Sequence, residues 1–178
     1  MHRPQILATK SHRISPWVTL QERSILWSKS DFPETYHSIS QSDYVSVLAV
    51  TADGLVPLVR QYRPAIQDFT LELPGGIAEY GEQPSVTAER ELHEETGYLL
   101  SSPLLELGSL APDVGRLENR LWGYLALDVH HDPLWQPESK IIPILNKIDT
   151  FKASVIDGSF DNALHVALVS LALLRGLI

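Results

Sequence analysis

Three glutamates lie close together in a stretch that the sequence predicts to be a helix. Glu94 and Glu95 follow Glu91 by three and four residues, so all three side chains share one side of a helix. Like charges at this spacing destabilise an isolated helix, and only Arg90 is near enough to offset them. Ligands that are all oxygen favour a hard cation such as Mg²⁺ or Mn²⁺. The cluster is therefore either a solvated acidic helix face or the ligand set of such a cation.

The segment that precedes this helix favours the metal site. Residues 69–73 alternate like a strand, and Pro74, Gly75 and Gly76 follow them directly. Because glycine has no side chain, its backbone can approach a ligand closely and turn carbonyl or amide groups toward it. A strand, a glycine loop and an acidic helix in this order can hold a metal between the backbone and the carboxylates.

The spacing of these residues resembles the signature of the Nudix hydrolases. The positions that match are Gly76, Glu82, Arg90, Glu91, Leu92, Glu94, Glu95, Gly97 and Tyr98, where only Tyr98 departs from the usual aliphatic residue. The resemblance implies an α/β/α sandwich that cleaves a diphosphate bond with the help of Mg²⁺, or of Mn²⁺.

The same resemblance implies roles for individual residues. Glu91 and Glu95 correspond to direct metal ligands, Glu94 to a direct or water-mediated ligand, and the carbonyl of Gly75 to a backbone ligand. Two further residues correspond to supporting groups, since Arg90 would orient the glutamates and Glu82 would brace the loop and the helix.

The flanking sequence resembles the ADP-ribose diphosphatase (ADP-sugar diphosphatase) branch of this family. The similar stretches are residues 59–64 and 71–76, and the N-terminal residues 1–43 are similar to an extension that forms a small sheet across a homodimer in that branch. The branch implies hydrolysis of ADP-ribose or a related nucleoside diphosphate sugar to a nucleoside monophosphate and a sugar phosphate. Two alternatives stay open: hydrolysis of nucleoside triphosphates or other nucleotides, and a nucleotide-sensing module without catalysis.

Several residues are candidate substrate contacts in this branch. Trp17 and Tyr36 could stack on a base, although exposed aromatic residues also serve as packing or dimer contacts. Arg63 could bind a phosphate with two hydrogen bonds or form a surface ion pair. The full set of candidate substrate-binding residues is Trp17, Tyr36, Arg63, Glu72, Gly76 and Glu118.

The general base is open among three glutamates. Glu138 occupies the loop position where this branch commonly carries the base, Glu118 lies in an earlier polar loop, and Glu94 could activate water itself. Reach to the attacking water decides between such candidates.

The elements that position these residues are predicted to be mostly strands, with few helices. The patterns predict short exposed strands within residues 14–44, and further strands at 44–51, 55–62, 69–73, 104–110, 120–129 and 140–145. Helices are predicted at 84–96, at 148–156 and in the final stretch from Ala163, with Asp161 placed to cap the last one. The fold class is therefore α+β, a Nudix α/β/α sandwich with a mixed sheet and a small N-terminal β extension, divided into residues 1–43 and a Nudix hydrolase domain at 44–178.

The amino-acid composition excludes some classes of binding partner. With 22 acidic and 14 basic residues and a net charge of −8, the chain lacks the excess of Lys and Arg that binds nucleic acid by a broad basic face. The final apolar stretch is too short for a bilayer and is interrupted by His165 and Arg175, so no membrane span is expected. Absence of cysteine fits a reducing, cytoplasmic location.

Overall fold

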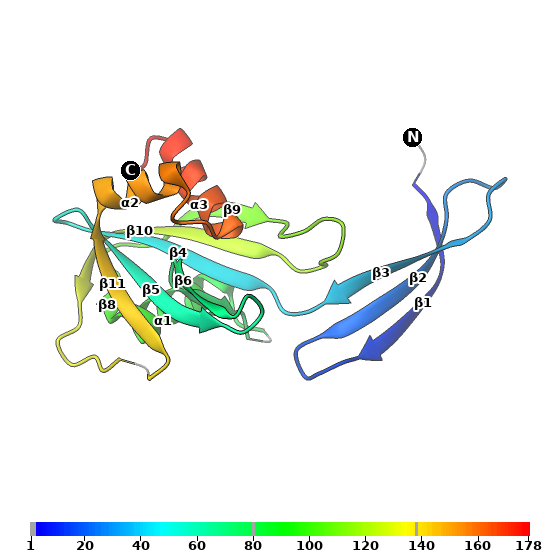
Figure 1. Cartoon of the computed structure of the whole chain (residues 1–178), viewed down its shortest axis with the longest axis horizontal. Coiled ribbons are helices and arrows are strands. Elements are labelled where there is room, and N and C mark those ends of the chain that lie inside the picture. The colour runs from blue at the N-terminus through cyan, green and yellow to red at the C-terminus, as the bar shows by residue number, and fades with distance from the viewer. Residues whose placement is uncertain (1–2, 80, 138) are drawn as a thin grey trace. The chain divides into compact units, whose positions relative to one another are not determined.

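The computed structural model describes residues 3–79, 81–137 and 139–178 (Figure 1). The chain divides into two compact units, each of which is described by itself. The first unit consists of Met1–Asp43 and Ala111–Arg120, and the second consists of Tyr44–Leu110 and Leu121–Ile178. A loop from the middle of the chain therefore belongs to the same unit as the N-terminal residues.

The first unit is an antiparallel sheet of three strands in the order β1-β2-β3. The strands are β1 (Gln5–Arg13), β2 (Thr19–Leu26) and β3 (Glu34–Ser40). The prediction of short strands within residues 14–44 is confirmed for β2 and β3, but it missed β1, all of whose residues are exposed. The middle-chain loop extends this sheet, since Ile39 N–H donates to the Arg116 carbonyl at 2.7 Å and Glu118 N–H donates to the Ile39 carbonyl at 3.0 Å.

The second unit contains two sheets, of five and three strands. In the larger sheet β4 (Tyr44–Thr51) pairs parallel to β10 (Leu121–His131), while β7 (Gly75–Ile77), β8 (Tyr98–Leu99) and β9 (Leu105–Leu110) pair antiparallel. The smaller sheet has the order β11-β5-β6, with strands β5 (Leu55–Arg63), β6 (Asp68–Glu72) and β11 (Ile141–Lys147). The expected mixed sheet is confirmed, whereas the short strands β7 and β8 were not predicted.

The described residues of the second unit also form the helices α1 (Pro84–Thr96), α2 (Ile148–Asp157) and α3 (Ala163–Leu174). Pro84 begins α1, where a missing N–H costs nothing, and Gly97 ends it with φ 75°, a left-handed conformation that favours glycine. The predicted cap of α3 was wrong by one residue. Asn162, and not Asp161, accepts hydrogen bonds from the N–H groups of Leu164 and His165.

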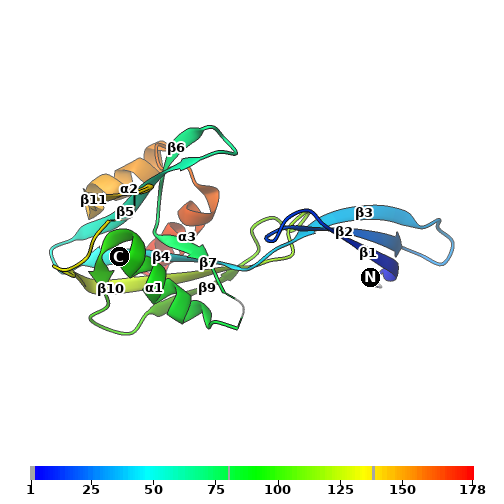
Figure 2. The ribbon, with the colours of Figure 1, turned by 90° about the horizontal axis from the view of Figure 1, so that it is seen from below.

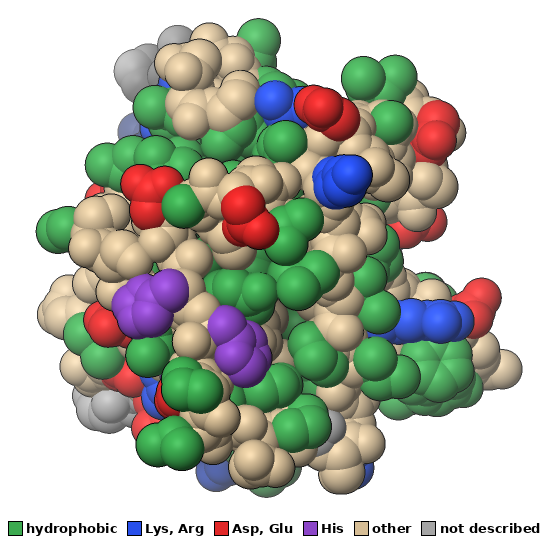
Figure 3. Space-filling model, turned by 90° about the vertical axis from the view of Figure 1, so that its left-hand side faces the viewer, with side chains coloured by type: hydrophobic (Ala, Val, Ile, Leu, Met, Phe, Trp, Pro, Cys, Tyr) green, Lys and Arg blue, Asp and Glu red, His purple; other side chains and the backbone are tan. Residues whose placement is uncertain are grey.

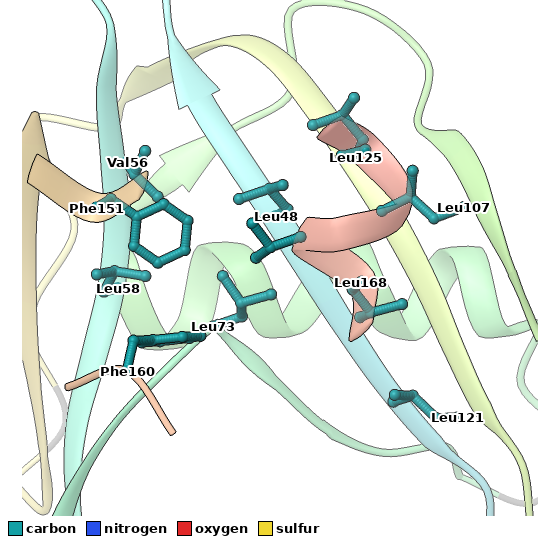
Figure 4. Close-up of a cluster of buried hydrophobic side chains, with 12 residues drawn as sticks. Leu48, Val56, Leu58, Leu73, Leu107, Leu121, Leu125, Phe151, Phe160 and Leu168 are labelled. Carbon is teal, nitrogen blue, oxygen red and sulfur yellow. The ribbon is translucent and has the colours of Figure 1, made fainter. Parts of the chain in front are cut away.

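Two hydrophobic cores lie on opposite faces of β4, because successive side chains of a strand point to opposite sides. On one face Val45, Val47 and Ala49 pack with the buried residues of α1. On the other face Leu48 packs with Phe151 of α2 and Leu168 of α3 (Figure 4). Figure 2 shows the helices on both sides of the β4–β10 pair. This arrangement confirms the predicted α/β/α sandwich.

The surface composition and the helix lengths are relevant to the predictions about nucleic acid and membranes as partners. Figure 3 shows one face of the chain, on which hydrophobic side chains are interspersed with single acidic, basic and histidine side chains. Among the described residues, no helix is both long enough and apolar enough to span a bilayer.

Candidate active site

The carboxylate helix α1 is held against β4 by its apolar side. Ala88 and Leu92 are fully buried between α1 and the sheet, which places the neighbouring glutamates along the edge of this contact. Glu95 is buried, Glu91 is half-buried and Glu94 is exposed. The three glutamates thus share one side of the helix, as predicted, but they differ in their access to solvent.

The two glycines of β7 bring the backbone directly against two of these carboxylates. Gly75 N–H donates a hydrogen bond of 2.8 Å to Glu95 Oε2. A Cβ atom on Gly76 would overlap the carboxylate of Glu91, and one on Gly75 would overlap the carbonyl oxygen of Val45. The backbone of β4 therefore leaves no room for a side chain at Gly75, and a side chain at Gly76 would displace the Glu91 carboxylate. The predicted approach of backbone and carboxylates is present here.

Arg90 forms hydrogen bonds with three glutamates, of which two lie on α1 and one lies in the loop before it. Its Nη1 donates to Glu91 Oε1 at 2.9 Å and to Glu94 Oε2 at 2.8 Å, and its Nη2 lies 3.4 Å from Glu82 Oε2. Partial burial opposes the charge of Arg90, but the hydrogen bonds to Glu82 and Glu94 and the charge of Glu91 raise its pKa. Glu82 also accepts a hydrogen bond of 2.8 Å from Thr87 Oγ1, a residue that the sequence did not single out.

The donor set of this region fits a hard divalent cation in its chemistry. Glu91 and Glu95 supply carboxylate oxygens next to the backbone of Gly76 and Gly75, and oxygen is the donor atom that hard divalent cations prefer. Among residues 3–79, 81–137 and 139–178, no three acidic or histidine side chains converge on one point as they stand. The carboxylates of Glu91 and Glu94 turn toward Arg90, and that of Glu95 turns toward the Gly75 amide.

A cavity of about 700 Å³ adjoins these glycines within the second unit. Gly75 and Gly76 line it together with polar side chains from three other elements and one loop. From β5 and β6 come Gln61, Arg63, Thr70 and Glu72, and from α3 and the loop before it come Asp161, Asn162 and His165. Its volume lies in the range of pockets that bind small molecules.

Arg63 and Glu72, both candidate substrate contacts, are paired with each other. Arg63 donates to Glu72 through Nε and Nη2, each at 2.7 Å. Burial alone would raise the pKa of Glu72, but hydrogen bonds from Arg63 and Thr70 outweigh it and lower the pKa. Asn162 Nδ2 lies 3.4 Å from Glu72 Oε2 and adds a third partner. Glu72 is thus buried and held in the cavity wall by its hydrogen bonds, while Arg63 is half-exposed and accessible to solvent.

His165 is a polar residue of the cavity wall that sequence reasoning missed. It is buried on α3, and its Nδ1 accepts a hydrogen bond of 3.1 Å from Leu73 N–H. Burial lowers the pKa of His165 to about 4, so the ring is neutral at pH 7. In the sequence, His165 was considered only as a polar interruption of an apolar stretch. Leu168 and Val169 follow it by three and four residues, so the helical period could have placed His165 on the same buried side of the helix.

Three candidate residues lie in the first unit. Trp17 is exposed and precedes β2, while Tyr36 packs edge-to-face against Trp27, which follows β2 at its other end. The structure therefore does not bring Trp17 and Tyr36 together. Glu118 accepts hydrogen bonds from Arg23 and Ser38, and the bond from Arg23 lowers its pKa. Glu118 thus joins the middle-chain loop to the N-terminal sheet.

The predicted base Glu138 lies outside the described residues. The segment that precedes it is fastened to the end of α1. Trp135 Nε1 donates to the Glu94 carbonyl at 3.1 Å, its ring lies against Gly97, and Asp132 pairs with His93 at 3.0 Å. The Glu94 carbonyl belongs to the last turn of the helix, where carbonyl groups lack intrahelical donors. Sequence reasoning did not identify Trp135.

Comparison with known proteins places this site in a family. Residues 41–144, more than half of the chain, match the NUDIX domain. The chain is 50% identical to the ADP-ribose pyrophosphatase of Bacillus subtilis (strain 168) over 54 residues, which are 30% of this chain and 29% of that protein. It is 48% identical to the ADP-sugar pyrophosphatase of Mus musculus over 61 residues, 32% of this chain and 28% of that protein. The matched segments thus span less than a third of these curated relatives.

A solved structure extends the likeness of the fold to nearly the whole chain. The crystal structure of an ADP compounds hydrolase superposes with a TM-score of 0.83, covering 99% of this chain and 97% of that one, at 20% sequence identity. The predicted Nudix fold is confirmed by this likeness and by the matched domain, which contains the glycines of β7 and the glutamates of α1. The chain belongs to the NUDIX family.

Proposed function

We propose that the chain hydrolyses the diphosphate bond of ADP-ribose or a related nucleoside diphosphate sugar, in a reaction that needs a divalent cation. The observation that carries this proposal is that Gly75 and Gly76 adjoin both the candidate metal ligands and the cavity. They lie against the carboxylates of Glu91 and Glu95, and they line the adjoining cavity. The names of the relatives from Bacillus subtilis and Mus musculus support the substrate class.

Glu91, Glu95 and the Gly75 carbonyl are our proposed ligands for Mg²⁺, or for Mn²⁺, with Glu94 binding directly or through water. A cation bound there would neutralise charge on the diphosphate and lower the pKa of a water molecule. Arg90 orients the carboxylates, which its hydrogen bonds to Glu91 and Glu94 support. Glu82 braces Arg90 and is itself held by Thr87.

In the proposed reaction, a water oxygen bonds to one phosphorus and the bridging P–O bond breaks. The products are a nucleoside monophosphate and a sugar phosphate, and a carboxylate accepts the proton of the water. Glu138 is our first candidate for this base, and Glu94 is the second because it is exposed on the ligand side of α1. The bonds from Arg23 and Ser38 favour a structural role for Glu118. Turnover of Glu138→Gln and Glu94→Gln variants across a pH series distinguishes the first two candidates.

The first unit is proposed to join two copies of the chain and to supply Trp17 for stacking on the base. All residues of β1 are exposed, and Ile6 and Leu7 are large apolar residues among them. Such an exposed strand edge is a template for pairing with another chain. We also propose that the enzyme is cytoplasmic and binds no nucleic acid, as the lack of cysteine and the net charge of −8 suggest. A monomer in sedimentation at micromolar concentration would refute the dimer.

The activity is tested by release of phosphomonoester products from a panel of ADP-ribose, other nucleoside diphosphate sugars and nucleoside triphosphates. Each substrate is assayed with Mg²⁺, with Mn²⁺ and with EDTA. We expect multiple turnovers on ADP-ribose or another diphosphate sugar with metal, and none with EDTA. Preference for triphosphates would overturn the substrate class, and binding without turnover would show a sensing module.

A further inference from the structure

The first turn of α3 places a histidine in the wall of the cavity that contains Gly75 and Gly76. His165 lines this cavity although only 8% of the residue is exposed. Its ring stacks on Phe160, with the centroids 6.3 Å apart and the planes at 28°. The proposed cation ligands and base do not include this residue, so its polar ring requires an explanation of its own.

A backbone hydrogen bond fixes which ring nitrogen carries the proton. Leu73 N–H donates to Nδ1 of His165 at 3.1 Å, so Nδ1 is the unprotonated nitrogen. A neutral imidazole has one N–H group, which must then be on Nε2. Leu73 is itself buried and directly follows β6, two residues before Gly75.

The Nε2–H group is left without a protein partner. Among the described residues, no hydrogen bond to His165 Nε2 is formed. Within the same residues, the only fully buried side-chain nitrogen or oxygen that lacks a partner is Nδ2 of Asn119. Nε2 of His165 therefore retains accessible surface, and the open space next to this residue is the cavity.

Two neighbouring polar side chains of the same wall, Asn162 and Glu72, are already engaged with the protein. Asn162 Oδ1 caps α3, and its Nδ2 faces Glu72. The carboxylate of Glu72 is shared by Arg63 and Thr70. His165 thus differs from them, because its free group is a single neutral donor with a fixed direction. Such a donor suits an oxygen acceptor of a ligand, as hydroxyl or phosphate groups provide.

We propose that His165 is a substrate-binding residue, whose Nε2–H donates a hydrogen bond to an oxygen of the nucleoside diphosphate sugar. The identity of the ligand rests on the proposed function, but the contact can be tested without turnover. Loss of one neutral hydrogen bond weakens binding by about three- to tenfold.

The first experiment observes the ring nitrogens of the wild-type enzyme by ¹⁵N NMR. The signals of His165 are assigned by their loss in a His165→Asn variant, and the other histidines of the chain serve as internal controls. We expect the Nε2-protonated tautomer at pH 7 and a shift of its Nε2 signal on addition of ADP-ribose in EDTA, which prevents hydrolysis. An Nδ1-protonated ring, or an Nε2 signal that does not move, overturns the proposal.

This measurement separates the two proposals. If the Nε2 signal shifts but ADP-ribose is not hydrolysed with Mg²⁺, the proposed activity fails and the contact stands. If hydrolysis proceeds while the signal stays unchanged, the contact fails and the activity stands.

The second experiment uses two variants of α3. In His165→Asn, Oδ1 can replace Nδ1 as the acceptor for Leu73 N–H, while the donor at the far side of the ring is lost. We expect KM for ADP-ribose to rise about three- to tenfold with kcat unchanged, as for loss of a contact made equally in the ground and transition states. Val169→Ala, a buried truncation in the same helix, is the matched control and should leave KM within about twofold. An equal rise of KM in both variants would show a merely structural role.

Discussion

The two units of the chain are built in contrasting ways. The second unit buries both faces of β4, and its cores include residues from all three helices. In the first unit, Ile25 is the only hydrophobic residue that is buried among those described, and β1 is exposed along its whole length. A small sheet is stable by itself only when it has a hydrophobic face or packs against a helix. The second unit therefore has the packed core and the candidate metal ligands, while the first unit consists mostly of exposed and half-buried residues.

The largest effect is expected from removing the charge of one carboxylate, Glu95, in the second unit. Glu95→Gln keeps an oxygen that can accept the Gly75 N–H but removes the charge that a cation needs. We expect kcat for diphosphate hydrolysis to fall by about 10³-fold, with little change in the melting temperature. Glu22→Gln, which removes an exposed partner of Lys10 in the first unit, is the control and should retain full activity. Near-normal activity of Glu95→Gln would remove this residue from the ligand set.

Truncation of apolar side chains tests the difference in packing. Phe151 is fully buried, and Phe151→Ala should lower the free energy of unfolding by about 4 kcal/mol. Leu7 is exposed in β1, and Leu7→Ala in a monomer should change it by less than about 0.5 kcal/mol. Urea denaturation at several protein concentrations measures both. A large, concentration-dependent loss for Leu7→Ala would show instead that β1 is covered by a second copy.

The buried histidine gives the second unit a pH dependence. Because burial lowers the pKa of His165 to about 4, the unfolded chain takes up a proton near pH 6.5 before the folded chain does. The free energy of unfolding should therefore fall as the pH is lowered from about 6.5 to about 4, by about 3 kcal/mol at most from this group. Denaturation across this range, compared with His165→Asn, checks the effect. A curve that the variant leaves unchanged would contradict it.

The smallest expected effect concerns an aromatic residue of the first unit. Trp17→Ala should raise KM for ADP-ribose about fivefold through lost stacking on adenine, with the stability of the second unit unchanged. Phe32→Ala is the matched control, because Phe32 is an exposed aromatic residue of the same unit and is not proposed to contact the base. Steady-state kinetics of both variants decide the role, and an unchanged KM for Trp17→Ala would leave it as a surface residue.

Most of the second unit could be predicted from local signals. Pro84 and Gly97 bound α1 as expected, and Gly158 ends α2 in a left-handed conformation. The glutamate spacing also predicted that Glu91, Glu94 and Glu95 share one side of a helix, and all three lie in α1. These features depend on residues that are close in the sequence, where backbone preference and helical period determine the outcome.

The rest depends on contacts between residues that are distant in the sequence. The apolar residues of β1 are adjacent and do not alternate with polar ones, and the whole strand is exposed, so its sequence carries no pattern of a half-buried strand. His165 meets Leu73, and Glu118 meets Arg23, only through the tertiary fold. The position of the α3 cap was missed by one residue, because Asp161 and Asn162 are both favourable caps and local preference does not separate them.

The middle-chain loop has a consequence for the order in which the protein forms during synthesis. The β1–β3 sheet is complete in the sequence by Ser40, yet the groups that extend it at Ile39 belong to Arg116 and Glu118. Domains generally fold as units while the chain emerges from the ribosome, N-terminal part first. Here the N-terminal sheet must wait for more than seventy further residues before its edge is paired. During that interval the outer edge of β3 is unpaired, and an unpaired strand edge is a template for pairing with another chain.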